Sequence, residues 1–308
     1  MPRLRHPETV PDVERKAVDT DGVVPLATLH DAGVTRGQRA AQIVARRWVP
    51  IPRRGIITTT GAVSGDAAIR LALLQVGPAA AVGGVSALQL AGMTGFDEDH
   101  LHIWVPKSAF KAKPVDVALH ETRRWVEDDV LVTGIRRSRS EIATIQAALW
   151  ATSRRQSALL LIMPVQQRLV RAADLVDPLE RVRRHEFRSM LRGVLADVLG
   201  GVQSLNELDF ARLCRAHGLP EPTRQVRRTS PQGRIYLDVH WDGYGVSLEV
   251  NGAGHGILTQ AMSDEIRAMD IQVEGDAAVQ VSSVTIRVDP KPFVEALGRL
   301  LRSRGWSG

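Results

Sequence analysis

The chain has 308 residues, 44% of them hydrophobic, and 40 basic against 34 acidic side chains give a formal net charge of +6. This length allows two domains or a small three-part assembly, each with its own core. No apolar run reaches the roughly 18 residues of a membrane span, and the N-terminus lacks a secretory signal, so we expect a cytoplasmic protein with no membrane partner. A single cysteine, Cys214, excludes an intramolecular disulfide and a cysteine-based zinc cluster, and we expect it in the core.

Residues 1–62 have the pattern of a winged helix-turn-helix. We expect a short apolar helix over 24–29 and a second helix over 36–47 that is capped by Thr35. The second helix is expected to divide into two faces: Ala40, Ile43 and Val44 on one, and Arg36, Arg39 and Gln42 on the other. Two short strands around an Arg-Arg-Gly tip at 53–55 would form the wing.

Arginine is concentrated in this region, since six arginines and no acidic residue occur between positions 36 and 54. Arginine patches neutralise phosphates and release counterions, so double-stranded DNA is the expected partner. The alternative is that these arginines are only solvated cations. The predicted DNA contacts are Arg36, Arg39, Gln42, Arg46, Arg53, Arg54, Arg227 and Arg228. Helix-turn-helix geometry also occurs in proteins that bind only protein, so contact with DNA is a hypothesis.

Residues 63–200 predict a mixed α/β middle domain with a helical linker. Strands are expected over 101–106, 115–120 and 129–133. The pattern becomes helical from 140 to 198, with breaks near Pro164 and Pro178. The arginines between 181 and 188 are expected on a helix, as a solvated face or as a phosphate-binding one.

After the wing, the chain continues with a helix over 66–74, the stretch Ala81–Gly92 with its Ser86-Ala-Leu element, and a strand that ends in Pro106. This layout resembles the N-terminal half of actinobacterial proteins grouped with AbiEi-type antitoxins. In those proteins a winged helix is joined to a small helix-and-strand domain. We expect Ser86 to cap a buried helix rather than to be catalytic.

The stretch 234–252 alternates between β-branched or aromatic and polar residues on either side of an Asp-Gly-Tyr-Gly turn, which predicts a strand hairpin. Asp238 lies on one face of the first strand, and Glu249 and Asn251 share a face of the second, so the two carboxylates can meet across the hairpin. Paired carboxylates suit Mg²⁺ or Mn²⁺, and such an ion can activate water for phosphodiester hydrolysis. The hairpin therefore predicts a nuclease site.

Residues 201–308 contain, in order, a helix from Ser204, a strand from Gln225, this hairpin, a helix around 263–267, a late strand at 283–288 and a final helix over 290–302. The ordered set resembles endonuclease-like domains related to very-short-patch repair endonucleases, in the PD-(D/E)XK nuclease superfamily. The resemblance implies a restriction-endonuclease-like α/β domain. The expected fold class is therefore α+β multidomain, with divisions at 1–62, 63–200 and 201–308.

The resemblance also implies roles for individual residues. Asp238 and Glu249 would be the metal-binding carboxylates, with Glu207 as a further ligand. Gln225 and His255 would flank the cleft. Asn251 stands where the superfamily has a lysine; an amide cannot act as a cation or a base, although it can orient water or a phosphate oxygen.

Two functions remain open from the sequence. In the first, the chain is a Mg²⁺- or Mn²⁺-dependent deoxyribonuclease that acts in DNA repair or in defence against foreign DNA. In the second, a catalytically inactive nuclease fold serves as a DNA-binding transcriptional regulator or antitoxin. Glu207 also has a simpler explanation, because Ser204 and Glu207 have the spacing of a helix capping box.

Overall fold

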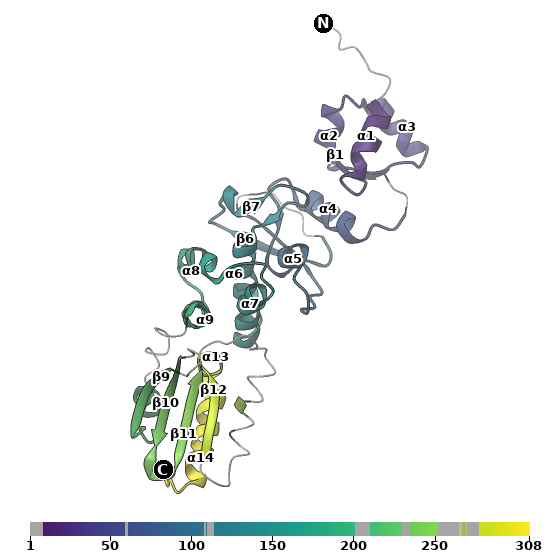
Figure 1. Ribbon diagram of the computed structural model, residues 1–308. Helices are drawn as coiled ribbons and strands as arrows, with labels where there is room; N and C mark the ends of the chain where they lie inside the picture. The colour runs from purple at the N-terminus through teal and green to yellow at the C-terminus, as the bar shows by residue number, and fades with distance from the viewer. Residues whose placement is uncertain are drawn as a thin grey trace. The chain divides into compact units, whose positions relative to one another are not determined.

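The computed structural model of the chain describes residues 9–58, 61–107, 109, 114–200, 210–229, 235–251, 265–266, 269 and 277–308 (Figure 1). The chain divides into two compact units, Met1–Leu90 with Thr94–Arg139 and Ala91–Met93 with Ser140–Gly308. Both units contain helices and strands, which confirms the mixed α+β class. No helix in the described ranges is long and apolar enough to cross a membrane.

The first unit begins with three helices and three short strands. They are α1 (Thr9–Val18), β1 (Val23–Pro25), α2 (Leu26–Asp31), α3 (Arg36–Val44), β2 (Val49–Ile51) and β3 (Gly55–Ile57). The strands form an antiparallel sheet in the order β1-β3-β2. Thr35 caps α3 as predicted, in a capping box in which it exchanges hydrogen bonds with Gln38. The two strands expected around the Arg-Arg-Gly tip are also present.

Two details of this region differ from the prediction. Residues 23–25 form a strand because Val23 and Val24 are buried against β3, and the helix begins only after Pro25. The faces of α3 also differ, because Ile43 packs against the core whereas Ala40 is exposed and Val44 is 83% exposed. Positions 36, 40 and 44 follow one another at intervals of four residues and share the solvent side of the helix.

Helix α4 (Gly65–Val76) connects the N-terminal sheet to a second sheet of the same unit. Ala67, Leu71 and Leu74 pack on the cluster of Val23, Ile51 and Ile57 from the first sheet. Ala72 and Val76, on nearly the opposite side of the helix, pack against the second sheet. A helix with apolar residues on two sides can bury both of them, so α4 joins the two sheets into one packed unit.

The second sheet has five strands in the order β6-β5-β4-β8-β7. Its elements are β4 (Ala81–Val82), α5 (Gly84–Leu90), β5 (Leu101–Pro106), β6 (Val117–Thr122), the 3-10 turn η1 (Glu127–Asp129), β7 (Val130–Leu131) and β8 (Arg137–Ser138). The three strands predicted here are all present, although β6 and β7 have different limits. Ser86 does not cap α5; it lies inside the helix, where its hydroxyl accepts the main-chain N–H of His102.

The second unit opens with a helical layer. It consists of α6 (Ser140–Trp150), α7 (Arg154–Gln166), the 3-10 turn η2 (Ala172–Leu175), α8 (Val176–Arg181) and α9 (Arg188–Gly200). Pro164 does not break α7, because its buried ring lies near the helix end and removes only one main-chain hydrogen bond. Pro178 is in the first turn of α8, where its N–H is not needed. Arg183 and Arg184 lie between α8 and α9, so the predicted arginine helix is wrong.

The remaining elements are α11 (Phe210–Ala216), β9 (Arg224–Thr229), β10 (Ile235–Trp241), the 3-10 turn η3 (Asp242–Tyr244), β11 (Val246–Asn251), β12 (Ala277–Ser282), α13 (Ser283–Val288) and α14 (Pro290–Ser303). The strands form one sheet in the order β12-β11-β10-β9, in which only β11 and β12 are parallel. One face of this sheet packs against α14 (Figure 1) and, through Phe210 and Cys214, against α11; Cys214 is buried there as predicted. The final helix matches its prediction closely.

The predicted late strand at 283–288 is wrong. The strand ends at Ser282, whose hydroxyl accepts the N–H of Thr285 and so caps α13. Val284 and Val288, one helical turn apart, then pack against α7 and α9 in the helical layer. The chain therefore turns from the sheet back to the helices six residues earlier than the β-branched composition indicated.

Candidate metal and nucleic-acid sites

The β10–β11 hairpin places Asp238 directly opposite Glu249, as the alternation predicted. From Tyr236 to Trp241 and from Val246 to Asn251, the aliphatic residues and Trp241 are buried, and the residues between them are partly exposed. The partly exposed set includes Tyr236, Asp238 and His240 on β10 and Ser247, Glu249 and Asn251 on β11. Opposite residues of an antiparallel pair have Cβ atoms about 4.5–5.5 Å apart, so the two carboxylates share one small area of this polar face.

Asp238 is held by two basic side chains. Nε of Arg228, on the neighbouring strand β9, donates to Oδ2 of Asp238 at 2.8 Å. Nε2 of His240 lies 2.8 Å from Oδ1, although the ring N–H is not well aligned for a hydrogen bond. Partial burial alone would raise the pKa of Asp238, but the contacts with His240 and Arg228 outweigh it and lower this pKa below its usual value. Asp238 is therefore a carboxylate at neutral pH.

Glu249 has a neutral neighbour. Gln280 lies opposite it on the parallel strand β12, with its Nε2 3.4 Å from Oε1 of Glu249. Asn251 lies two residues further along β11 on the same face, opposite Tyr236. The polar face thus carries a row across all four strands, from Arg228 through Asp238 and Glu249 to Gln280.

This donor set fits a divalent ion with few protein ligands. Two carboxylates from adjacent strands are enough for Mg²⁺, which keeps several waters and completes its shell with phosphate oxygens. In the described part of the chain, no group of three or more His, Cys, Asp or Glu side chains is arranged to hold a metal. Arg228 and His240 would have to release Asp238 oxygens to an incoming ion. Asp238 and Glu249 are the residues that would hold it.

The other predicted site residues are not all brought to this face. Gln225 lies opposite Val239, on the core side of the sheet, and its Oε1 accepts the N–H of Phe210 at 3.1 Å. The same register places Arg228 on the carboxylate face and Arg227 on the opposite one. The predictions for Glu207 and His255 fall outside the described residues.

The predicted DNA contacts of the first unit occur in two groups. On α3, Arg36 is exposed and Arg39 is half-buried, while Gln42 accepts a hydrogen bond from Arg47 at 3.3 Å. Arg46 is exposed just beyond the helix, and Arg53 is exposed in the turn between β2 and β3, with Arg54 half-buried beside it. The arginines at 46 and 53 both have positive φ angles, of 57° and 62°.

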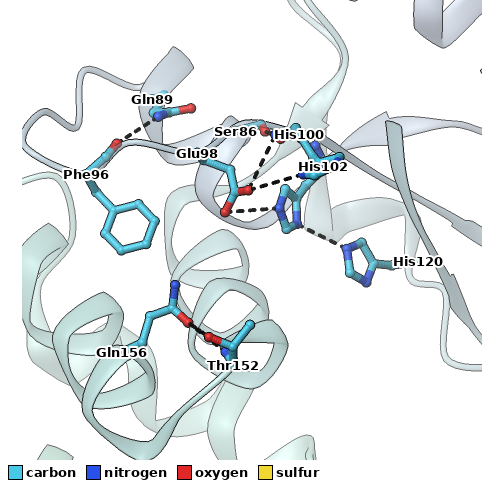
Figure 2. A network of polar contacts seen from close by, with 9 residues as sticks. All are labelled: Ser86, Gln89, Phe96, Glu98, His100, His102, His120, Thr152 and Gln156. Atoms are coloured by element: carbon cyan, nitrogen blue, oxygen red, sulfur yellow. Dashed lines mark hydrogen bonds and ion pairs between the residues drawn. The ribbon is translucent and has the colours of Figure 1, made fainter. Parts of the chain in front are cut away.

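Three ionisable side chains of the first unit, Glu98, His102 and His120, lie in contact with one another, which the sequence did not predict (Figure 2). Nε2 of His102 lies 3.4 Å from Oε2 of Glu98, and its Nδ1 lies 3.1 Å from Nε2 of His120. The two rings are stacked, with centroids 5.1 Å apart. The signal available in the sequence was a histidine in each of two expected strands. Because the two histidines are 18 residues apart in the sequence, only the parallel pairing of their strands showed that the rings meet.

Burial is the main influence on the pKa values of the two histidines. Desolvation, together with a smaller effect of the nearby His102, lowers the pKa of His120 to about 4. Desolvation also lowers the pKa of His102, against the opposing charge and hydrogen bond of Glu98. The main chain fixes the geometry, because the N–H of His102 donates to Ser86 Oγ at 2.9 Å. His120 is therefore neutral at physiological pH.

Comparison with known proteins gives little further information. No protein-family model matches the chain, and no curated protein matches it. Among solved structures, the crystal structure of RV2827C protein from Mycobacterium tuberculosis is similar, with a TM-score of 0.41 and 18% sequence identity. The similarity covers 66% of this chain and 81% of that one. Similarity at this level assigns neither a family nor a function.

Proposed function

We propose that the chain is a DNA-binding protein whose polar sheet face hydrolyses DNA phosphodiester bonds with the help of Mg²⁺ or Mn²⁺. The observation that carries the proposal is the direct pairing of Asp238 with Glu249 on the partly exposed face of a sheet whose other face is core. Carboxylates are costly on a half-buried surface unless a cation balances them. A pair facing each other is an arrangement that a divalent ion would stabilise.

The order of elements in residues 210–308 supports a restriction-endonuclease-like domain. A helix, a strand, the hairpin, helical residues at 265–266 and 269, another strand and a final helix follow one another as the resemblance implies. The fourth strand lies six residues earlier than expected, and α13 is inserted after it. In this proposal, residues 9–57 are a winged helix-turn-helix that brings the nuclease-like domain to double-stranded DNA.

When bound, a divalent ion would polarise a phosphate oxygen and lower the pKa of a water molecule. The chain's own residues do the rest. Arg228 is positioned to leave Asp238 and pair with a phosphate oxygen, since a guanidinium matches both anions. Gln280 orients Glu249, and Asn251 can orient a water or a phosphate oxygen without moving a proton.

A second function is favoured by the same contacts. Arg228 already balances the charge of Asp238, and Asn251 offers no cation where the superfamily has lysine. A sheet face neutralised by its own side chains needs no metal. In this alternative the fold is catalytically inactive and the chain is a DNA-binding regulator or an antitoxin, in keeping with the AbiEi-like layout of its N-terminal half.

A plasmid-cleavage assay with Mg²⁺ or Mn²⁺ separates the two functions. We expect wild-type protein to nick or linearise the plasmid, and Asp238→Asn and Glu249→Gln each to lower the rate at least about 100-fold, because each removes a carboxylate that would hold the ion that stabilises the transition state. Asp242→Asn is the matched control, since Asp242 lies on the same hairpin and contacts only Arg224, at 3.7 Å, in the ion pairs of the described residues.

Cleavage that survives both site substitutions would contradict the nuclease proposal, because a contaminating or different activity would be responsible. Retention of duplex DNA without cleavage, with affinity that falls steeply as salt rises, would support the regulator instead. Equal loss of activity in the control Asp242→Asn would show a general effect on the hairpin rather than a role for the pair.

A further inference from the structure

The first unit contains a pocket of about 460 Å³ beside the β2–β3 turn. Leu26 of α2, Leu73 and Leu74 of α4, and Ile135 before β8 supply much of its apolar lining. These residues come from the N-terminal sheet region and from the five-stranded sheet region, which α4 packs together. The volume lies within the range of about 300–1,000 Å³ that small-molecule sites occupy.

Four arginines also line this pocket, and two of them are already paired. Nε of Arg70 donates to Asp21 at 2.9 Å, and Arg136 forms an ion pair with Glu127. Arg53 and Arg54 differ: among the described residues neither guanidinium has a carboxylate partner. The pocket therefore has two unbalanced positive charges beside an apolar wall.

We propose that this pocket binds a small organic anion with an apolar body and a carboxylate, phosphate or sulfonate group. The anionic group would pair with Arg53 and Arg54, because guanidinium groups form strong, often bidentate hydrogen bonds with such oxygens. The apolar body would cover the leucines of α2 and α4. A DNA backbone alone would leave that apolar surface uncovered, which is why the size and lining favour a small molecule.

Arg53 and Arg54 are also among the proposed DNA contacts, so a bound anion would compete with duplex DNA. This regulatory step rests on the proposed function, whereas occupancy of the pocket does not. The two arginines cannot pair fully with a ligand and with a phosphate backbone at the same time. Ligand binding would therefore release the wing from DNA.

The test uses two fluorescent probes with a shared apolar body, 1-anilinonaphthalene-8-sulfonate and the uncharged N-phenyl-1-naphthylamine. Both are titrated into the full chain. We expect Arg53→Gln combined with Arg54→Gln to weaken sulfonate binding about tenfold or more and to leave the neutral probe nearly unchanged. Ala27→Trp places a bulky ring at the exposed lining position of α2 and should weaken both probes.

The matched control is Arg46→Gln combined with Arg47→Gln, a second adjacent pair whose first member also has a positive φ angle. This pair does not line the pocket, so it should change neither titration. Circular dichroism melting confirms that each variant is folded. Sulfonate binding that is unchanged in both the Arg53–Arg54 variant and Ala27→Trp would overturn the proposal, as would equal weakening in the control.

A short DNA duplex added to the probe complex tests the regulatory step separately. Displacement of the sulfonate probe by duplex, at low salt, would support competition. If the probe binds and responds to the variants as expected but duplex DNA does not displace it, the anion-binding pocket is supported and the proposed contact of Arg53 and Arg54 with DNA is contradicted. The two proposals therefore fail under different results.

Discussion

His120 shows how far burial can move the chemistry of a single side chain. Its pKa is lowered to about 4 by desolvation and by the neighbouring His102. Between this value and the ordinary histidine pKa of about 6.5, the unfolded chain binds a proton that the folded chain does not. The contribution of His120 to the free energy of unfolding is therefore fully present above about pH 6.5 and decreases as the pH falls toward 4.

We predict that His120→Gln flattens this dependence. The variant carries no titrating group at position 120, so its melting temperature should fall less than that of the wild type between about pH 6.5 and 4. Circular dichroism melts at several pH values measure the effect. His30→Gln is the control, because His30 has a side chain that is 86% exposed. Parallel pH profiles for wild type and His120→Gln would contradict the lowered pKa.

For the residues of the candidate metal site, the sequence predicted one contact and missed another. Strict alternation in the hairpin predicted that Asp238 and Glu249 share a face, because strand side chains repeat with a period of two. It could not predict that Arg228 pairs with Asp238. That contact depends on the register between β9 and β10, which the alternation within the hairpin does not specify.

At the scale of elements, the close approach of β1 and β3 sets a strict requirement at Gly55. A Cβ atom at this position would lie 2.1 Å from the carbonyl oxygen of Val24, which no side-chain rotation can relieve. Gly37, inside α3, has no atom within 4 Å of the corresponding position. The two glycines therefore differ in what they would tolerate.

We predict that Gly55→Ala destabilises the first unit by about 2–4 kcal/mol, because the strands must separate to admit a methyl group. Gly37→Ala should instead stabilise it by about 0.5–1 kcal/mol, since alanine is the better helix former. Urea or thermal unfolding of both variants measures the difference. Equal stability for the two variants would show that β1 and β3 do not approach as closely as described.

The elements also show why some predictions failed. Residues 283–288 are rich in β-branched side chains, which favour strands, yet Val284 and Val288 meet the helical layer only if the segment is a helix. Residues 23–25 show the opposite case, since an apolar run that could begin a helix pairs with β3 instead. Short apolar runs do not distinguish the two structures, and tertiary contacts decide.

At the scale of the whole molecule, the proposed function divides between the two units. The arginines of α3 and of the β2–β3 turn belong to the first unit, and the paired carboxylates belong to the second. The net charge of +6 favours an anionic partner throughout. We therefore expect both units to contact phosphates and only the second unit to hydrolyse them.

The most direct test of the central proposal is a titration with Mn²⁺ followed by electron paramagnetic resonance. We predict that the wild-type chain binds one Mn²⁺ and that Asp238→Asn combined with Glu249→Gln abolishes this binding, because no carboxylate of the pair remains. Asp242→Asn should bind as the wild type does. Equal Mn²⁺ binding by the wild type and the double variant would contradict the assignment of Asp238 and Glu249 as a metal site.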